Sequence, residues 1–82
     1  MGGLYYVYIL RSVGFPDRHY TGFTEDLRER LRYHNAGRVA HTSKYAPWLI
    51  KTALAFHRRE RALAFERYLK SASGRAFAAK HL

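Results

Sequence analysis

The sequence predicts an α/β (α+β) sandwich in which a three-stranded, mainly antiparallel sheet is flanked by helices. Three observations indicate this fold class: three stretches rich in aromatic and β-branched residues, two amphipathic helical stretches, and turn residues between them. Their order along the chain is strand, strand, helix, strand, helix, with a short further helix at the end. With 82 residues, of which 48% are hydrophobic, we expect residues 1–82 to form one domain around one core.

The strands are predicted from their composition. Residues 4–11 (LYYVYILR) are rich in aromatic and β-branched residues, and residues 18–23 (RHYTGF) follow after the turn sequence SVGFPD. The two stretches therefore predict an antiparallel hairpin. Residues 48–56 (WLIKTALAF) predict a third strand. Residues 37–47 (GRVAHTSKYAP) are polar and basic, and we expect a loop there.

The helices are predicted from capping residues and apolar spacing. The first helix is expected to begin with Thr24 as its N-cap, because acidic residues follow it in the first turn, where the helix dipole favours them. It is expected to end near Asn35, before Gly37. The second helix is expected over about residues 59–72, with Gly74 ending it. The last eight residues, RAFAAKHL, predict a short third helix.

The composition favours a polyanionic partner. The formal net charge is +9, from 15 basic and 6 acidic residues, and 11 of the basic residues are arginine. Such a balance is typical of nucleic-acid binders, and arginine suits bidentate contacts with phosphate. A basic host proteome or ribosome association is the alternative explanation.

Several other classes of protein are excluded or disfavoured. The absence of cysteine excludes disulfides and cysteine-ligated zinc. No apolar run approaches a membrane span, and we expect no signal peptide. We therefore expect a cytoplasmic protein that binds nucleic acid and no membrane.

The first predicted helix carries two polar residues on its apolar face. At about 100° per residue, Arg30 and His34 share the face marked by Leu27 and Leu31. Arg30 at the edge of the face could extend its guanidinium to water. His34 could be a hydrogen-bonded histidine at a helix end. A functional site on this face is the competing interpretation.

The second predicted helix shows a similar irregularity with the opposite charge. Glu66 lies on the apolar face formed by Ala62, Phe65 and Leu69. Glutamate is rarely buried without a partner. An internal salt bridge, for example with Arg30, is one interpretation, and a carboxylate directed at a cation in a cleft is the other.

Two tyrosines complete a candidate constellation. Tyr8, Tyr20, Arg30 and Glu66 come from four separate elements, and each could point into one groove where the sheet meets the helices. Core packing is the ordinary explanation for any single tyrosine in a strand. A phenol, a guanidinium and a lone carboxylate in a basic protein suggest phosphodiester chemistry.

Two tripeptides carry a resemblance to a known family. YVY at residues 6–8 and YTG at residues 20–22 resemble the paired motif of the GIY-YIG nucleases, although Tyr6 replaces the first glycine and Thr21 the middle isoleucine. The resemblance covers most of the chain and is closest to the small stand-alone bacterial members.

Single residues extend the resemblance. Arg30 matches the essential arginine of the family, and His34 matches a helix position that carries histidine or tyrosine. Glu66 matches the metal-binding glutamate of the later helix. The resemblance thus implies a metal-dependent DNA endonuclease.

The resemblance also implies roles for these side chains. Glu66 and waters would hold one divalent cation, Mg²⁺ or Mn²⁺. Arg30 would stabilise the transition state. Either Tyr8 or Tyr20 would activate the attacking water, and the sequence does not decide between them. His34 would hydrogen-bond that tyrosine or shuttle its proton.

Other basic residues are candidates for phosphate contacts, and two other functions compete with the endonuclease. Arg38, Lys44 and Arg59 are candidate phosphate anchors, with a solvated surface charge as the alternative for each. A catalytically weak nucleic-acid-binding module and a partner-binding domain of a repair or processing complex are the competing functions. A protein partner or a dimer could supply specificity.

Overall fold

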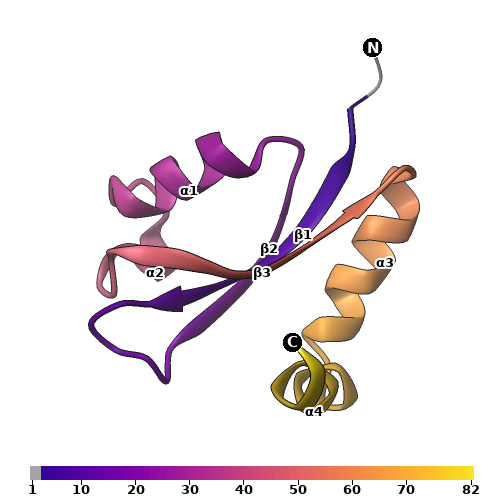
Figure 1. The fold of residues 1–82 in the computed structure, drawn as a ribbon. Coiled ribbons are helices and arrows are strands. Elements are labelled where there is room, and N and C mark those ends of the chain that lie inside the picture. The colour runs from indigo at the N-terminus through magenta and orange to yellow at the C-terminus, as the bar shows by residue number, and fades with distance from the viewer. Residues whose placement is uncertain (1–2) are drawn as a thin grey trace.

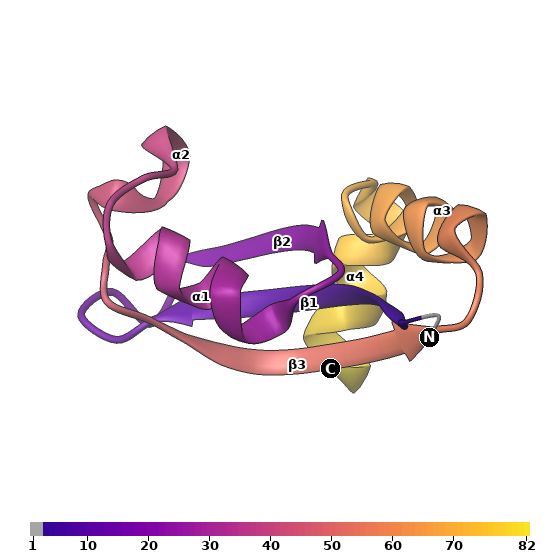
Figure 2. The same ribbon diagram turned by 90° about the horizontal axis from the view of Figure 1, so that it is seen from above.

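The computed structural model describes residues 3–82 and has the predicted fold class. Both strand pairs are antiparallel, and the spatial order is β2-β1-β3 (Figure 2). The strands are β1 (Tyr5–Ser12), β2 (His19–Thr24) and β3 (Trp48–Phe56). The helices are α1 (Leu27–Asn35), α2 (Ala40–Ser43), α3 (Arg59–Leu69) and α4 (Ala72–His81). Figure 1 shows α1 and α2 on one side of the sheet and α3 and α4 on the other. Over residues 3–82, no helix is long and apolar enough to span a membrane.

One face of the sheet packs against α3. Val7 and Ile9 of β1 form a buried cluster with Ala62 and Leu69, and Phe65 packs against it. The predicted apolar face of this helix is therefore confirmed. Burying a valine or leucine side chain contributes about 1.5–3 kcal/mol, so these contacts hold α3 on the sheet.

The opposite face packs against α1. Tyr8 and Leu10, which alternate with Val7 and Ile9 along β1, form a second buried cluster with Trp48. Leu27 and Leu31 of α1 pack against this cluster, as their spacing predicts. Tyr8 is 2% exposed, so its hydroxyl is carried into the layer between the sheet and α1.

The start of α1 differs from the prediction. Asp26, and not Thr24, is the N-cap, because its Oδ1 accepts a hydrogen bond from the Glu29 backbone N–H at 3.0 Å. Thr24 still belongs to β2, where it pairs with Tyr6. Its hydroxyl oxygen accepts a hydrogen bond from the Asp26 N–H at 3.1 Å. Threonine and aspartate both favour the N-cap position. Because Thr24 is paired in the sheet, the helix begins later, and Asp26 is its N-cap.

The predicted end of the second helix is also wrong. Gly74 does not end α3, which stops at Leu69, but lies in the first turn of α4. Its N–H donates to the Oγ of the N-cap Ser71 at 3.1 Å. A Cβ on Gly74 would collide with the carbonyl oxygen of Tyr68. The glycine therefore permits close packing between the two helices.

The predicted loop over residues 37–47 contains a short helix that the sequence analysis missed. α2 begins after Val39, whose side chain makes no capping hydrogen bond. Gly37 precedes it with a φ of 75°, a conformation that suits glycine. The helix directs Thr42 into the protein, where this side chain is fully buried.

Candidate active site

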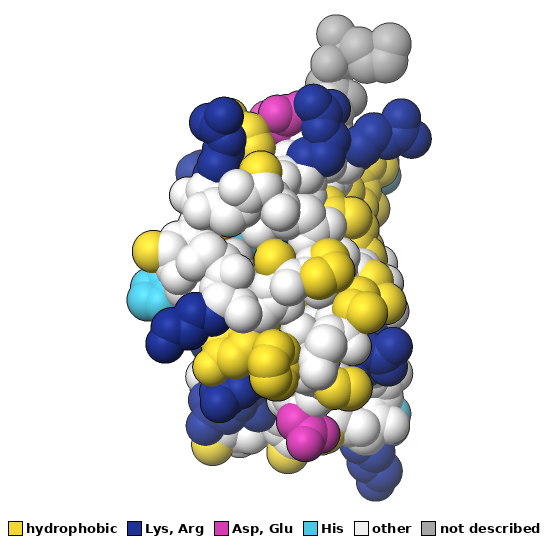
Figure 3. Space-filling model, turned by 90° about the vertical axis from the view of Figure 1, so that its left-hand side faces the viewer, with side chains coloured by type: hydrophobic (Ala, Val, Ile, Leu, Met, Phe, Trp, Pro, Cys, Tyr) yellow, Lys and Arg dark blue, Asp and Glu magenta, His cyan; other side chains and the backbone are white. Residues whose placement is uncertain are grey.

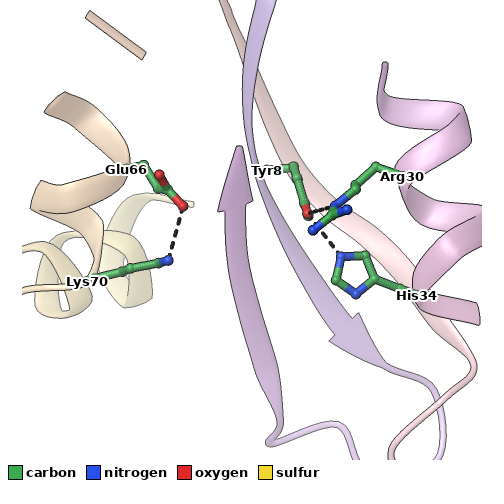
Figure 4. A network of polar contacts seen from close by, with 5 residues as sticks. All are labelled: Tyr8, Arg30, His34, Glu66 and Lys70. Atoms are coloured by element: carbon green, nitrogen blue, oxygen red, sulfur yellow. Dashed lines mark hydrogen bonds and ion pairs between the residues drawn. The ribbon is translucent and has the colours of Figure 1, made fainter. Parts of the chain in front are cut away.

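A chain of hydrogen bonds joins β1, α1 and α2 in the layer between the sheet and these helices. The Tyr8 hydroxyl lies 3.0 Å from Nε2 of His34, and Nε of Arg30 donates to the same hydroxyl at 3.4 Å (Figure 4). Nδ1 of His34 lies 2.8 Å from Oγ1 of Thr42. The Thr42 hydroxyl donates to the Val39 carbonyl oxygen at 3.2 Å.

Only one arrangement of protons satisfies this chain with a neutral imidazole. Thr42 has one hydroxyl proton, which goes to the Val39 carbonyl, so its oxygen accepts from Nδ1–H of His34. Nε2 of His34 then carries no proton and accepts from the Tyr8 hydroxyl. Neutral His34 thus presents a proton acceptor to the phenol.

Burial keeps both partners of this bond uncharged near neutral pH. His34 is fully buried, and its burial lowers its pKa, with a further lowering from the nearby charge of Arg30. Burial raises the pKa of the Tyr8 hydroxyl, while the hydrogen bond and charge of Arg30 oppose the rise. The proton therefore rests on Tyr8, and added positive charge near the hydroxyl would favour its transfer.

Tyr20 of β2 lies against the same group. Its ring centroid is 4.9 Å from that of His34 and 6.4 Å from that of Tyr8. The hydrogen bond to Tyr8 raises the pKa of Arg30, and Tyr20 adds to the rise. We call these five side chains the Tyr8 cluster: Tyr8, Tyr20, Arg30, His34 and Thr42.

A glycine makes room for the Tyr8 side chain. Gly22 is buried within β2, in the strand rather than in a turn, and pairs with Tyr8 across the sheet. A Cβ on Gly22 would collide with the hydroxyl end of Tyr8 and would lie 3.0 Å from Cε2 of Tyr20. The glycine of the YTG tripeptide therefore fixes where the phenol can lie.

Glu66 is not brought into contact with the Tyr8 cluster. It belongs to α3, on the opposite face of the sheet, and its Oε2 accepts from Nζ of Lys70 at 3.0 Å. The interpretation of an internal salt bridge therefore holds in part, since Glu66 forms one with Lys70 and not with Arg30. Figure 4 shows the Glu66–Lys70 pair on the α3 side of the strands and Tyr8, Arg30 and His34 on the α1 side. The charge of Glu66 still adds, after burial, to the rise in the pKa of Tyr8.

The donor chemistry at Glu66 fits a hard divalent cation. In the part of the chain that the structure describes, no group of three or more histidine or acidic side chains comes together. A cation at Glu66 would therefore have one carboxylate and waters as ligands, an arrangement that Mg²⁺ accepts. The Glu66 side chain is 18% exposed, and Lys70, paired with its carboxylate at 3.0 Å, is the group that a cation would displace.

The three predicted phosphate anchors lie outside the Tyr8 cluster. The guanidinium carbon of Arg38 lies 5.6 Å from the ring centroid of Tyr33, and that of Arg59 lies 5.6 Å from the ring centroid of Phe23. Lys44 is exposed just after α2. On the face shown in Figure 3, basic side chains lie mainly along the periphery. These positions are compatible with contacts to a polyanion, and the role of each stays a prediction.

Sequence reasoning missed Thr42 and Lys70, and it missed the packing role of Gly22. Thr42 lies in a segment without periodicity, so no pattern indicates that it meets His34. Lys70 stands four residues after Glu66, a spacing at which opposite charges on a helix pair, and this signal was available. Gly22 was identified only as part of a motif, and its packing against Tyr8 requires the strand register.

Comparisons with known proteins agree with the resemblance seen in the sequence. The model of the GIY-YIG catalytic domain matches residues 4–80. UPF0213 proteins of Streptococcus pyogenes serotypes M3 and M1 are each 35% identical over 72 residues, which are 87% of this chain and 76% of the relative. No solved structure gives a significant match. The family match spans nearly the whole chain, β1 to α4, and the chain therefore belongs to the GIY-YIG catalytic domain family.

Proposed function

We propose that this protein is a metal-dependent endonuclease that hydrolyses phosphodiester bonds of DNA. The observation that carries the proposal is the hydrogen-bonded series Arg30, Tyr8 and His34, in which a buried phenol has a proton acceptor on one side and a cation on the other. A tyrosine that only packs in a core needs a hydrogen-bond partner for its hydroxyl, but it does not need a guanidinium at the same oxygen. The family membership and the net charge of +9 support the same function.

The proposed general base is Tyr8. The oxygen of water attacks the phosphorus, and the bond from phosphorus to the leaving sugar oxygen breaks. The water proton passes to the Tyr8 oxygen while the phenol's own proton moves to Nε2 of His34, 3.0 Å away. Tyr20 contacts the His34 ring, but no hydrogen bond joins its hydroxyl to this histidine. This difference favours Tyr8 over Tyr20 as the base.

Arg30 has two tasks in the proposed mechanism. Its positive charge opposes the rise that burial produces in the pKa of Tyr8, so it favours loss of the phenolic proton. The guanidinium is also partly exposed, so it can bind a non-bridging phosphate oxygen and stabilise the charge that develops there. The bond to Tyr8 is long, at 3.4 Å, and its geometry leaves Arg30 able to shift toward a phosphate.

Glu66 is the proposed metal ligand. A cation held there would supply charge stabilisation for the phosphate and the leaving oxygen. Glu66 would bind it with one carboxylate, and Lys70 would release that carboxylate and become free to contact a phosphate. Because Glu66 and the Tyr8 cluster lie on opposite faces, we propose that the scissile phosphate lies over the edge strand β2, within reach of both.

Nicking of supercoiled plasmid in Mg²⁺ or Mn²⁺ tests this function. We expect wild type to nick the plasmid, and Arg30→Ala and Glu66→Gln to lose at least about a hundredfold in rate. Arg28→Ala is the matched control, because Arg28 is an exposed arginine on the same helix. If wild type binds DNA but leaves it intact across metals and pH, the nuclease proposal fails.

A catalytically weak nucleic-acid-binding module is the second candidate function. One observation favours it: Glu66 is paired with Lys70 and forms no hydrogen bond or ion pair with Tyr8 or Arg30. The same assay distinguishes the two functions, since a binding module would retain DNA binding in Glu66→Gln with no nicking in any variant.

A further inference from the structure

A cavity lies on the α3 and α4 side of the sheet, and Tyr20 is the one member of the Tyr8 cluster among its lining residues. Its volume is about 510 Å³, within the range of small-molecule sites. β1, β2, β3 and both helices contribute to its walls. The lining residues are Ile9, His19, Tyr20, Thr21, Lys51, Leu69, Lys70, Arg75, Ala78 and Ala79.

The interior of the cavity is apolar. Ile9 and Leu69 are buried members of the core, and Ala78 and Ala79 of α4 offer only methyl groups. Small side chains on this helix leave a volume that longer ones would fill. Such a surface accepts a flat apolar group and offers little to a sugar or an ion.

The remaining lining is cationic. Lys51, Lys70 and Arg75 surround the cavity, and no acidic side chain lines it. Nη1 of Arg75 donates to the Lys70 carbonyl oxygen at 2.7 Å, which holds the guanidinium at this end of α3. Burial lowers the pKa of His19, with further lowering from Lys51 and Arg11, as expected where positive charge gathers. The cavity therefore suits an anionic ligand with an apolar body.

The cavity adjoins the proposed metal ligand. Lys70 lines it and also pairs with Glu66 at 3.0 Å. Tyr20 lines it from β2 and contacts His34 on the other face. His19, Tyr20 and Thr21 of β2 line the cavity, so a nucleic-acid strand whose phosphate lies over the edge of β2 would pass beside it.

We propose that this cavity binds one unpaired nucleotide of the substrate strand, next to the scissile phosphate. The base contacts the apolar interior formed by Ile9, Leu69 and α4, and Lys70 and Arg75 contact the phosphate. A base inside a duplex is stacked and paired, so it enters such a cavity only when it lies in a single-stranded arm or leaves the stack. The cavity thus selects DNA with unpaired segments. This inference rests on the proposed function, which it deepens.

Binding without metal tests the inference separately from catalysis. Fluorescence anisotropy in EDTA compares a blunt DNA duplex with the same duplex carrying a single-stranded arm. Ala79→Phe places a ring in the cavity, and Ala76→Phe is its control, on an exposed position of α4 that does not line the cavity. Arg75→Ala is compared in the same way with Lys80→Ala.

We expect wild type to bind the duplex with the single-stranded arm about tenfold more tightly than the blunt duplex. Ala79→Phe and Arg75→Ala should lose this difference, and both controls should keep it. Equal binding of the two DNAs by wild type, or a difference that survives both cavity variants, overturns the inference. Circular dichroism melting establishes whether each variant is folded. If Ala79→Phe does not fold, the comparison of Arg75→Ala with Lys80→Ala decides the outcome.

Plasmid nicking identifies which proposal fails. Nicking by wild type together with unchanged arm preference in the cavity variants overturns the cavity and leaves the nuclease standing. Tighter binding of the DNA with the single-stranded arm that is lost in the cavity variants, without nicking in any metal, supports nucleotide binding in the cavity and overturns the nuclease proposal.

Discussion

The Tyr8 hydroxyl and Nε2 of His34 lie 3.0 Å apart, with both side chains buried between the sheet and α1. A buried phenol needs a hydrogen-bond acceptor, and a buried imidazole needs both nitrogens satisfied. The Tyr8 hydroxyl and Nε2 of His34 therefore satisfy each other, and Oγ1 of Thr42 satisfies Nδ1 of His34. The hydrogen bond that satisfies these buried groups also places the proton of the Tyr8 hydroxyl so that it can move to Nε2 of His34.

The first prediction separates the two tyrosines. Tyr8→Phe should lower the nicking rate by about a hundredfold or more, because the hydroxyl that would accept the water proton is gone. Tyr20→Phe keeps the Tyr8–His34 bond and should lose much less. Single-turnover nicking rates of the two variants measure this. A larger loss in Tyr20→Phe would assign the base to Tyr20 instead.

The second prediction concerns Thr42 as a positioning residue. Thr42→Val keeps the side-chain shape but leaves Nδ1 of His34 without an acceptor, which should cost about 1–3 kcal/mol of stability. It should also lower kcat with little change in KM, because the imidazole is no longer held as the Nδ1–H tautomer. Thr42→Ser restores the hydroxyl and should rescue kcat. If the Thr42→Ser and Thr42→Val variants have equal kcat at a temperature where both are folded, the positioning role is refuted.

The third prediction is a pH dependence of stability. The pKa of His34 in the folded protein is lowered from its ordinary value of 6.5, so the unfolded chain takes up the proton first as the pH falls. The free energy of unfolding should therefore decrease from about pH 6.5 downward, by at most about 1.4 kcal/mol per pH unit for this one proton.

Urea unfolding at a series of pH values measures this dependence. His34→Gln should flatten the decrease, and His41→Gln, which changes an exposed histidine, should leave it in place. His19 also has a lowered pKa and is present in both variants, so its contribution cancels in the comparison. An unchanged slope in His34→Gln would count against a buried neutral His34.

The fourth prediction tests the space beside the phenol. Gly22→Ala forces the hydroxyl end of Tyr8 to move, and that end is held by Arg30 and His34. We expect a loss of about 1–3 kcal/mol in stability and a reduced nicking rate. Gly14→Ala is the matched control, because nothing lies within 4 Å of a Cβ at Gly14. Equal melting temperatures for the two variants would contradict the packing argument.

The fifth prediction concerns competition for Glu66. Lys70→Met removes the ammonium that occupies the carboxylate, so half-maximal nicking should need a lower Mg²⁺ concentration. The maximal rate should fall if Lys70 also contacts the phosphate. Arg67→Met is the control, since Arg67 is an exposed cation on the same helix. A Mg²⁺ requirement that is unchanged in Lys70→Met would show that the pair does not compete with the metal.

Much of the fold could be predicted because it depends on local patterns. Aromatic and β-branched runs predict the three strands, and the spacing of Leu27 and Leu31 predicts the face of α1 that meets the sheet. The same spacing places Arg30 and His34 on that face. Helical periodicity depends only on residues that are close in the sequence, so it can be recognised without knowing which distant residues the helix contacts.

Other features depend on contacts between distant residues and could not be predicted. Gly74 has the usual character of a helix stop, yet its place is decided by the Tyr68 carbonyl that packs against it. The pairing of Glu66 with Lys70 rather than Arg30 follows from α1 and α3 lying on opposite faces of the sheet. Thr42 meets His34 only because the chain folds back between α1 and β3.

The position of β2 at the border of the sheet has a consequence for self-association. An outer strand offers unpaired backbone groups to which a second chain can add a strand. Addition at β2 would cover Gly22 and the space over which Tyr8 and Glu66 are proposed to cooperate, so such a dimer would exclude substrate. Addition at β3, the opposite border, would leave that space open. An active dimer joined by strand addition would therefore have to use β3.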